Sequence, residues 1–138
     1  MVVARRKVVP NIIRVACLLT DQVGNFVYVR NDVDGNGLVR VATCDTTTND
    51  KMPAWGVIIK KWDFTQALVQ TSGAVEGIYT GLEYRRVYWV GTDGKPTRPS
   101  PDATIGTGKS HTQAIGVALD ANILELKLSP WMFIKRFP

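Results

Sequence analysis

The sequence predicts an all-β fold, an antiparallel β-barrel or sandwich of about eight short strands with extended N- and C-terminal arms. From about residue 15 onward, short β-prone runs alternate with clusters of turn residues. The two-residue period is clearest near the C-terminus, where Leu124, Leu126 and Leu128 share one face of a strand and Glu125 and Lys127 share the other. No long helix-period stripe competes with this pattern.

The strands are predicted from runs rich in β-branched and aromatic residues, each bounded by turn residues. In chain order they are residues 15–19, 25–30, 38–43, 55–60, 66–71, 87–90, 113–119 and 122–128. Hairpin turns are expected at residues 34–37, 93–94 and 120–122, where Asp, Asn and Gly favour tight connections. Residues 95–112 are predicted as a long surface loop, because its prolines would remove hydrogen-bond donors from a central strand.

The chain of 138 residues is long enough for one domain, and its 45% hydrophobic and 21% charged residues are typical of a folded protein. We expect an N-terminal basic arm (1–14), a β-barrel domain (15–129) and a C-terminal aromatic and basic tail (130–138). No apolar run approaches the roughly 18 residues that span a bilayer, so no membrane partner is expected. Cys17 and Cys44 lie in apolar runs without metal-ligand spacing, and they are predicted to be reduced core residues.

The net charge of +5 is concentrated at the two ends, since neither residues 1–14 nor residues 127–138 contain an acid. Aromatic and arginine side chains carry much of the binding energy of protein interfaces. The predicted partner-binding residues are therefore Arg5, Arg6, Lys7, Arg14, Trp131, Phe133, Lys135, Arg136 and Phe137. The tail docks either on its own barrel or on a partner, and removing either end is expected to leave a folded barrel that attaches poorly.

Three motifs suggest chemistry but lack an element that the chemistry needs. Residues 103–110 approach a phosphate-binding P-loop, but prolines precede them and a β-like run follows. Residues 32–37 match the first half of a calcium loop, whose twelfth position would be Thr43 instead of glutamate; a partial cation site there stays open. His111 has no evident catalytic neighbours. We therefore expect no enzyme activity, no cofactor and no metal.

Several short motifs, in this order and spacing, resemble a family of small β-barrel modules in tailed-bacteriophage virion proteins. They are CLLT (17–20), VYV (27–29), KMPAWGVI (51–58), VQ (69–70), GAV (73–75), YTGL (79–82), VGTDGKPT (90–97) and QAIGVAL (113–119). The chain departs from the family at residues 83–86, where Glu-Tyr-Arg-Arg replaces a common Pro-Gly turn. The basic aromatic ends are also outside the shared pattern.

The resemblance implies a structural part of a phage particle. We expect a capsid decoration (cement) protein on the virion surface, made in the host cytoplasm, that binds the major capsid protein and itself, by analogy as a homotrimer. A neck, tail or fibre component that contacts the host is the first alternative. The second is a nucleic-acid-binding protein that uses the basic ends, although the mildly acidic body argues against nucleic acid as a partner.

Overall fold

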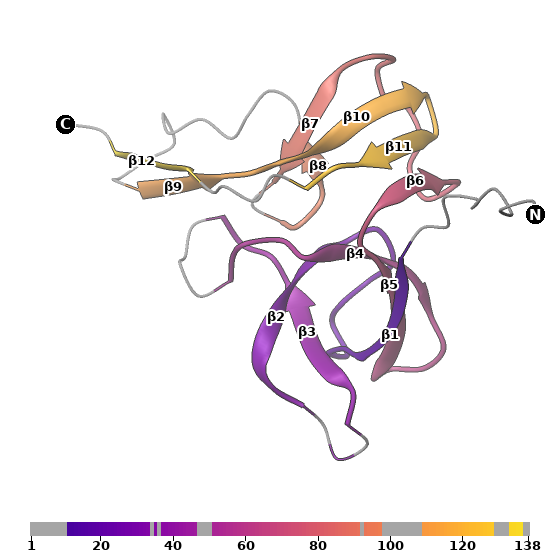
Figure 1. The fold of residues 1–138 in the computed structure, drawn as a ribbon, viewed down its shortest axis with the longest axis vertical. Coiled ribbons are helices and arrows are strands. Elements are labelled where there is room, and N and C mark those ends of the chain that lie inside the picture. The colour runs from indigo at the N-terminus through magenta and orange to yellow at the C-terminus, as the bar shows by residue number, and fades with distance from the viewer. Residues whose placement is uncertain are drawn as a thin grey trace, which may run out of the picture.

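The computed structural model describes residues 11–33, 35, 37–46, 51–91, 93–97, 109–128 and 133–136, with residues 31, 32, 109–112 and 133–136 described by their backbone only. These residues form twelve strands in three sheets, and none of them is helical. The all-β prediction is confirmed. Figure 1 shows a barrel below, a second sheet above it, and a two-stranded ribbon at one side.

The first half of the chain closes a five-stranded barrel, with strand order β1-β3-β2-β4-β5. Its strands are β1 (Ile12–Ala16), β2 (Phe26–Val33), β3 (Val39–Thr43), β4 (Gly56–Lys61) and β5 (Gln66–Gln70). Strand β1 closes the barrel by pairing antiparallel with β5 along its whole length and parallel with β3 at Ala16↔Arg40. Alternate residues point inward and form a small buried core, which includes Val15, Val27, Val41, Ile58 and Val69.

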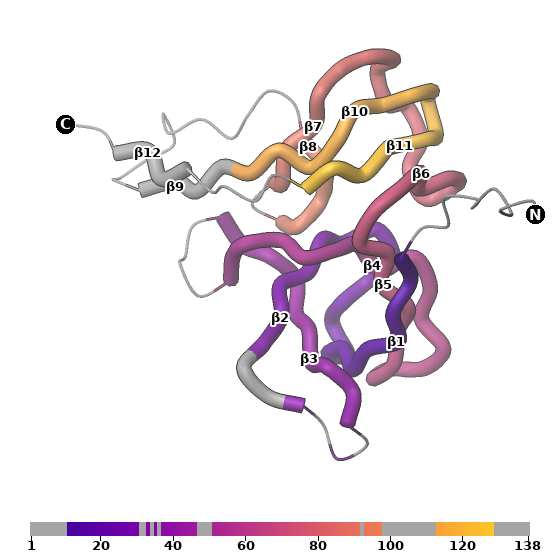
Figure 2. The backbone as a smooth tube through the Cα atoms, in the orientation of Figure 1, coloured from indigo at the N-terminus to yellow at the C-terminus, as the bar shows by residue number. Residues whose placement is uncertain are grey.

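The second half of the chain forms a five-stranded sheet of order β6-β11-β10-β7-β8. Its strands are β6 (Gly73–Glu76), β7 (Val87–Val90), β8 (Pro96–Thr97), β10 (Ala114–Asp120) and β11 (Ile123–Leu126). The larger core lies between this sheet and the barrel, because Phe26 and Val57 of the barrel pack in one cluster with Ile115 and Leu124 of the sheet. Figure 2 shows the chain completing the barrel before it enters this sheet.

A third, two-stranded sheet pairs β9 (Lys109–Thr112) with β12 (Phe133–Arg136). Part of the loop predicted over residues 95–112 is therefore a strand, and so is the middle of the segment predicted as a C-terminal tail. The loop prediction failed because β9 is stabilised by a partner more than twenty residues further along, which no local pattern reveals. Pro96 does lie in a strand, but β8 is the last strand of its sheet, where a missing donor is tolerated.

Each of the eight predicted strands overlaps an observed one, and β7 has the predicted ends. The strands on either side of the predicted turns at 34–37, 93–94 and 120–122 pair antiparallel, β2 with β3, β7 with β8 and β10 with β11. The first strand is three residues earlier than predicted. The Asp21 carboxylate accepts a hydrogen bond from Leu18 N, and Asp21 N donates to Leu18 O, so residues 18–21 turn and do not extend.

Arg85 adopts φ +67°, a left-handed conformation that costs a residue with a Cβ about 1–2 kcal/mol. It lies in the turn at residues 83–86, which is closed by the hydrogen bond from Arg86 N to Glu83 O. We expect Arg85→Gly to raise the free energy of unfolding by about 0.5–1 kcal/mol, measured by urea denaturation. Arg86→Gly is the matched control, because no positive φ is found there and glycine should bring no gain.

Candidate binding surfaces

Arg14 is the one predicted partner-binding residue whose side chain is described. It projects from β1, is exposed, and donates through its guanidinium to the Gln66 side-chain oxygen. Phe133, Lys135 and Arg136 lie in β12, which is described by its backbone only. The other five, Arg5, Arg6, Lys7, Trp131 and Phe137, lie outside the described residues. A partner role for all nine therefore stays a prediction.

An exposed apolar patch lies at the turns that follow β1 and β4. We call it the Trp62 patch; its members are Leu18, Leu19, Val23, Trp62 and Phe64. Phe64 is 71% exposed, Leu19 64% and Trp62 49%. Single exposed apolar residues are normal, but a cluster of large ones typically marks an interaction surface. This patch was not among the predicted sites, and the one sequence signal for it is the aromatic pair Trp62 and Phe64 between two predicted strands.

Hydrogen bonds fix the two turns that carry the patch. In the β4–β5 turn, one Asp63 carboxylate oxygen accepts from Thr65 N at 2.7 Å and from Gln66 N at 2.9 Å. In the β1–β2 connection, the Lys61 ammonium donates to the carbonyl oxygens of Leu18, Leu19 and Asp21 at 3.3, 3.3 and 2.6 Å. A patch held this way loses little conformational entropy when it binds.

The charges beside the Trp62 patch are mixed with a small positive excess, because Arg14, Lys60 and Lys61 lie there with two acids, Asp21 and Asp63. The guanidinium carbon of Arg14 lies 5.2 Å from the centre of the Trp62 ring, and the Lys60 ammonium nitrogen lies 5.8 Å from it. The nearby acids are engaged internally: Asp21 is buried and accepts from Thr43 N and Thr43 Oγ1. Hydrogen bonds from Thr65 and Gln66 and the charge of Arg14 lower the pKa of Asp63. Arg14 and Lys60 form no ion pair with any described residue.

The patch borders a groove of about 440 Å³. Four members of the Trp62 patch line it, together with the polar residues between them: Leu19, Asp21, Gln22, Val23, Lys61, Trp62, Asp63 and Phe64. Its volume lies in the range of small-molecule and peptide sites. The surface between these side chains is therefore a shallow, open hollow with both apolar and polar lining residues.

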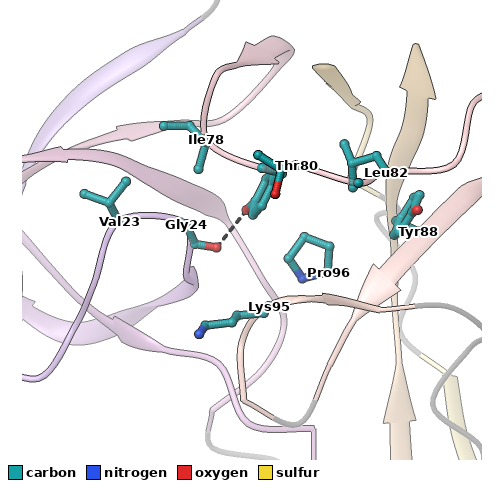
Figure 3. A pocket seen from close by; sticks show the side chains of 10 residues that line it. Val23, Gly24, Ile78, Thr80, Leu82, Tyr88, Lys95 and Pro96 are labelled. Atoms are coloured by element: carbon teal, nitrogen blue, oxygen red, sulfur yellow. Dashed lines mark hydrogen bonds between the residues drawn. The ribbon is translucent and has the colours of Figure 1, made fainter. Parts of the chain in front are cut away.

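A second cleft, also of about 440 Å³, lies where the barrel meets the second sheet (Figure 3). It is lined by Val23, Gly24, Ile78, Tyr79, Thr80, Gly81, Leu82, Tyr88, Lys95 and Pro96. The Tyr79 hydroxyl donates to Gly24 O at 2.7 Å and so ties the β6–β7 connection to the barrel; burial raises the pKa of this hydroxyl. Lys95 is exposed and forms no ion pair within the described part of the chain.

Val23 lines both the groove and the cleft, so the two hollows adjoin at this residue, and we call the stretch from Trp62 past Val23 to Lys95 the path. Cations lie at both ends of this path, with Arg14 and Lys60 beside Trp62 and Lys95 in the cleft. Figure 3 shows the Lys95 side chain extending toward the segment that carries Val23 and Gly24. This arrangement can bind an elongated ligand with apolar and negatively charged groups.

The motifs that suggested chemistry fall mostly outside the described residues. Lys109 and Ser110, the end of the P-loop-like motif, lie in strand β9, whereas a P-loop requires a helix there. The side chains of residues 32, 34 and 36 are outside the described set, so the cation prediction is not tested. Among the described residues, no three His, Cys, Asp or Glu side chains gather as metal ligands, and no helix is long and apolar enough to cross a membrane.

Both cysteines are free and buried, as predicted. Burial raises the pKa of the Cys17 and Cys44 thiols, most strongly that of Cys44, which is 1% exposed. We expect both thiols to resist a thiol reagent at pH 8 in native protein and to react in denaturant. Labelling of the native protein at the rate of the unfolded protein would contradict this expectation.

The buried thiol of Cys44 also predicts a pH dependence of stability. An unfolded cysteine ionises near pH 8.5, whereas the folded protein keeps this proton. The free energy of unfolding should therefore be unaffected by this group below that pH and should fall above it, by up to about 1.4 kcal/mol per pH unit. Urea denaturation between pH 8 and 10 measures the slope, which Cys44→Ala should reduce.

No protein-family model matches this chain, and no curated protein or solved structure matches it either.

Proposed function

We propose that this chain is a structural protein of a tailed-bacteriophage particle, a decoration (cement) protein that attaches to the head shell. One observation supports the proposal most directly. Residues of several motifs that carry the resemblance, although dispersed along the sequence, pack in one core cluster between the barrel and the second sheet, among them Val57, Val75, Val90 and Ile115. If the short motifs matched the family only by chance, there would be no reason for their residues to come together in the fold. Their shared contact therefore supports a resemblance of the whole module.

Four hydrogen bonds tie motif residues across the joint between the barrel and the second sheet. Gln113 of the QAIGVAL motif accepts from Ala54 N at 2.7 Å and donates to Ala54 O at 3.1 Å, and Ala54 belongs to KMPAWGVI. The Gly94 carbonyl of VGTDGKPT accepts from Phe26 N at 2.6 Å. Tyr79 of YTGL bonds to Gly24 O. The motif residues thus hold the barrel and the second sheet together. This structural role is consistent with a protein that acts by binding to the particle.

The surface features support attachment in the same way. A rigid, exposed apolar patch with cations beside it is the kind of surface that holds a protein on a partner. On a shell that presents many identical sites, moderate affinity at each copy is enough for high occupancy of the particle.

Mass spectrometry of purified particles tests the proposal, with the amount of this protein normalised to the major capsid protein. A decoration protein should be present in hundreds of copies. A small multiple would instead indicate the neck, tail or fibre alternative, and absence from the particles would contradict a virion role. Light scattering of the purified protein tests the expected trimer.

A further inference from the structure

We propose that the two hollows that adjoin at Val23, which run from Trp62 to Lys95, together form a docking site for an extended, acidic and apolar segment of a partner protein. This inference rests on the proposed function only for the identity of that partner. The site is distinct from the terminal arms predicted from the sequence, apart from Arg14, which contributes from β1.

The apolar character of the occupant follows from the side chains along the path. Phe64, Trp62 and Leu19 are each about half exposed or more at one end, while Leu82, Pro96 and Ile78 line the other end. Covering such side chains stabilises a complex by roughly 25 cal/mol for each Å² of apolar surface removed from water. Two adjoining concavities suit an extended chain, whose alternate side chains enter them in turn.

The acidic character follows from charge. Arg14, Lys60 and Lys95 lack carboxylate partners among the described residues, whereas the carboxylates of Asp21 and Asp63 already accept internal hydrogen bonds. Carboxylates on an incoming segment would meet three cations that form no ion pair with the described part of the chain. The ends of this chain are excluded as occupants on the same ground, because both are basic and contain no acid.

Nucleic acid fits the path less well than a protein segment. Bases bind by stacking on open aromatic faces, but Arg14 and Lys60 already lie over the Trp62 ring. A membrane surface is the other alternative, because exposed apolar and basic side chains also bind anionic lipid, and the test below distinguishes it.

The test measures fluorescence anisotropy of labelled synthetic peptides of about ten residues, which span about 33 Å when extended. One peptide pool is built from Leu, Phe, Gly, Asp and Glu, and a matched pool has Lys and Arg in place of the acids. The wild-type protein should bind the acidic pool at least about tenfold more tightly than the basic pool. The preference should weaken with salt, because the cations are exposed.

Variants locate the binding on the path. Trp62→Ser and Phe64→Ser should each weaken binding of the acidic pool by about tenfold or more, and Lys95→Gln should reduce the acidic preference. Tyr84→Ser is the matched control, because Tyr84 is an exposed aromatic residue, 66% exposed, that lines neither concavity, and its loss should leave binding unchanged. Urea denaturation checks that all variants are folded.

Equal binding of the two pools, no binding of the acidic pool, or an equal loss in Tyr84→Ser would overturn the inference. So would tighter, Trp62-dependent binding of oligothymidine or of anionic phospholipid vesicles. The outcome is separable from the proposed function. If the protein binds the acidic pool but is absent from the particles, the docking site stands and the virion role is contradicted. If the protein is abundant in the particles but binds no peptide, the virion role stands and the docking site is contradicted.

Discussion

Gly116→Ala is expected to destabilise the protein by about 3 kcal/mol or more, the largest effect of any single methyl group among the described glycines. A Cβ built at this position would lie 1.9 Å from Glu125 O and 2.9 Å from its carbonyl carbon. Both atoms belong to the backbone of β11, which pairs with β10 at Gly116↔Leu126. The strand cannot move away without breaking a ladder that also carries the core residues Leu124 and Leu126.

Urea denaturation measures this effect, and Gly35→Ala is its control. Gly35 is in the β2–β3 turn and has no atom within 4 Å of a built Cβ, so alanine should change the free energy of unfolding by less than about 0.5 kcal/mol. Similar midpoints for the two variants would show that β10 and β11 separate more easily than their pairing indicates. Loss of soluble protein for Gly116→Ala alone would agree with the prediction.

Gln113→Leu should lower the free energy of unfolding by about 2–5 kcal/mol. It removes the side-chain amide that bonds to both the N–H and the carbonyl oxygen of Ala54. Gln113 is 1% exposed and Ala54 5%, so water cannot easily replace the lost hydrogen bonds. Leucine has a similar volume, and the loss would therefore come from unsatisfied polar groups and not from a cavity.

The same substitution at an exposed glutamine, Gln22→Leu, should be nearly neutral and serves as the control. Thermal and urea unfolding of both variants, followed by tryptophan fluorescence, gives the comparison. Gln113→Leu with wild-type stability would mean that the joint between the sheets depends on apolar packing alone. A loss that also separates the transitions of the barrel and the second sheet would identify Gln113 as the residue that couples them.

The strands that the sequence predicted correctly are those whose local pattern carries the information. Leu124 and Leu126 are buried while Lys127 is exposed, as the two-residue period required. Strands β6, β9 and β12 were missed because they are four residues long and pair with strands distant in sequence, and β8 was missed because it is a two-residue edge strand that contains a proline. Their existence depends on tertiary pairing, which overrides weak local preference.

The surface was less predictable than the fold for a related reason. Residues 18 and 19 read as the end of a buried strand, so they were not expected to be exposed. They are exposed because Asp21 turns the chain and Lys61, forty residues further along, holds that turn through three carbonyl oxygens. A contact between residues so far apart produces no periodic pattern in the sequence. The concentration of basic residues at the two ends, by contrast, can be read from the sequence alone.

The division of the two sheets along the chain has a consequence for synthesis on the ribosome. Every strand of the barrel lies between residues 12 and 70, and the second sheet begins at Gly73. The barrel can therefore close while the second half is still being translated, with domains of this size forming as the chain emerges. During that interval the outward faces of Phe26 and Val57 have no cover, because the residues that bury them, such as Ile115 and Leu124, do not yet exist. A nascent chain paused there would expose the apolar outer face of the barrel to solvent. Slow translation beyond residue 70 should therefore favour aggregation over folding of the whole chain.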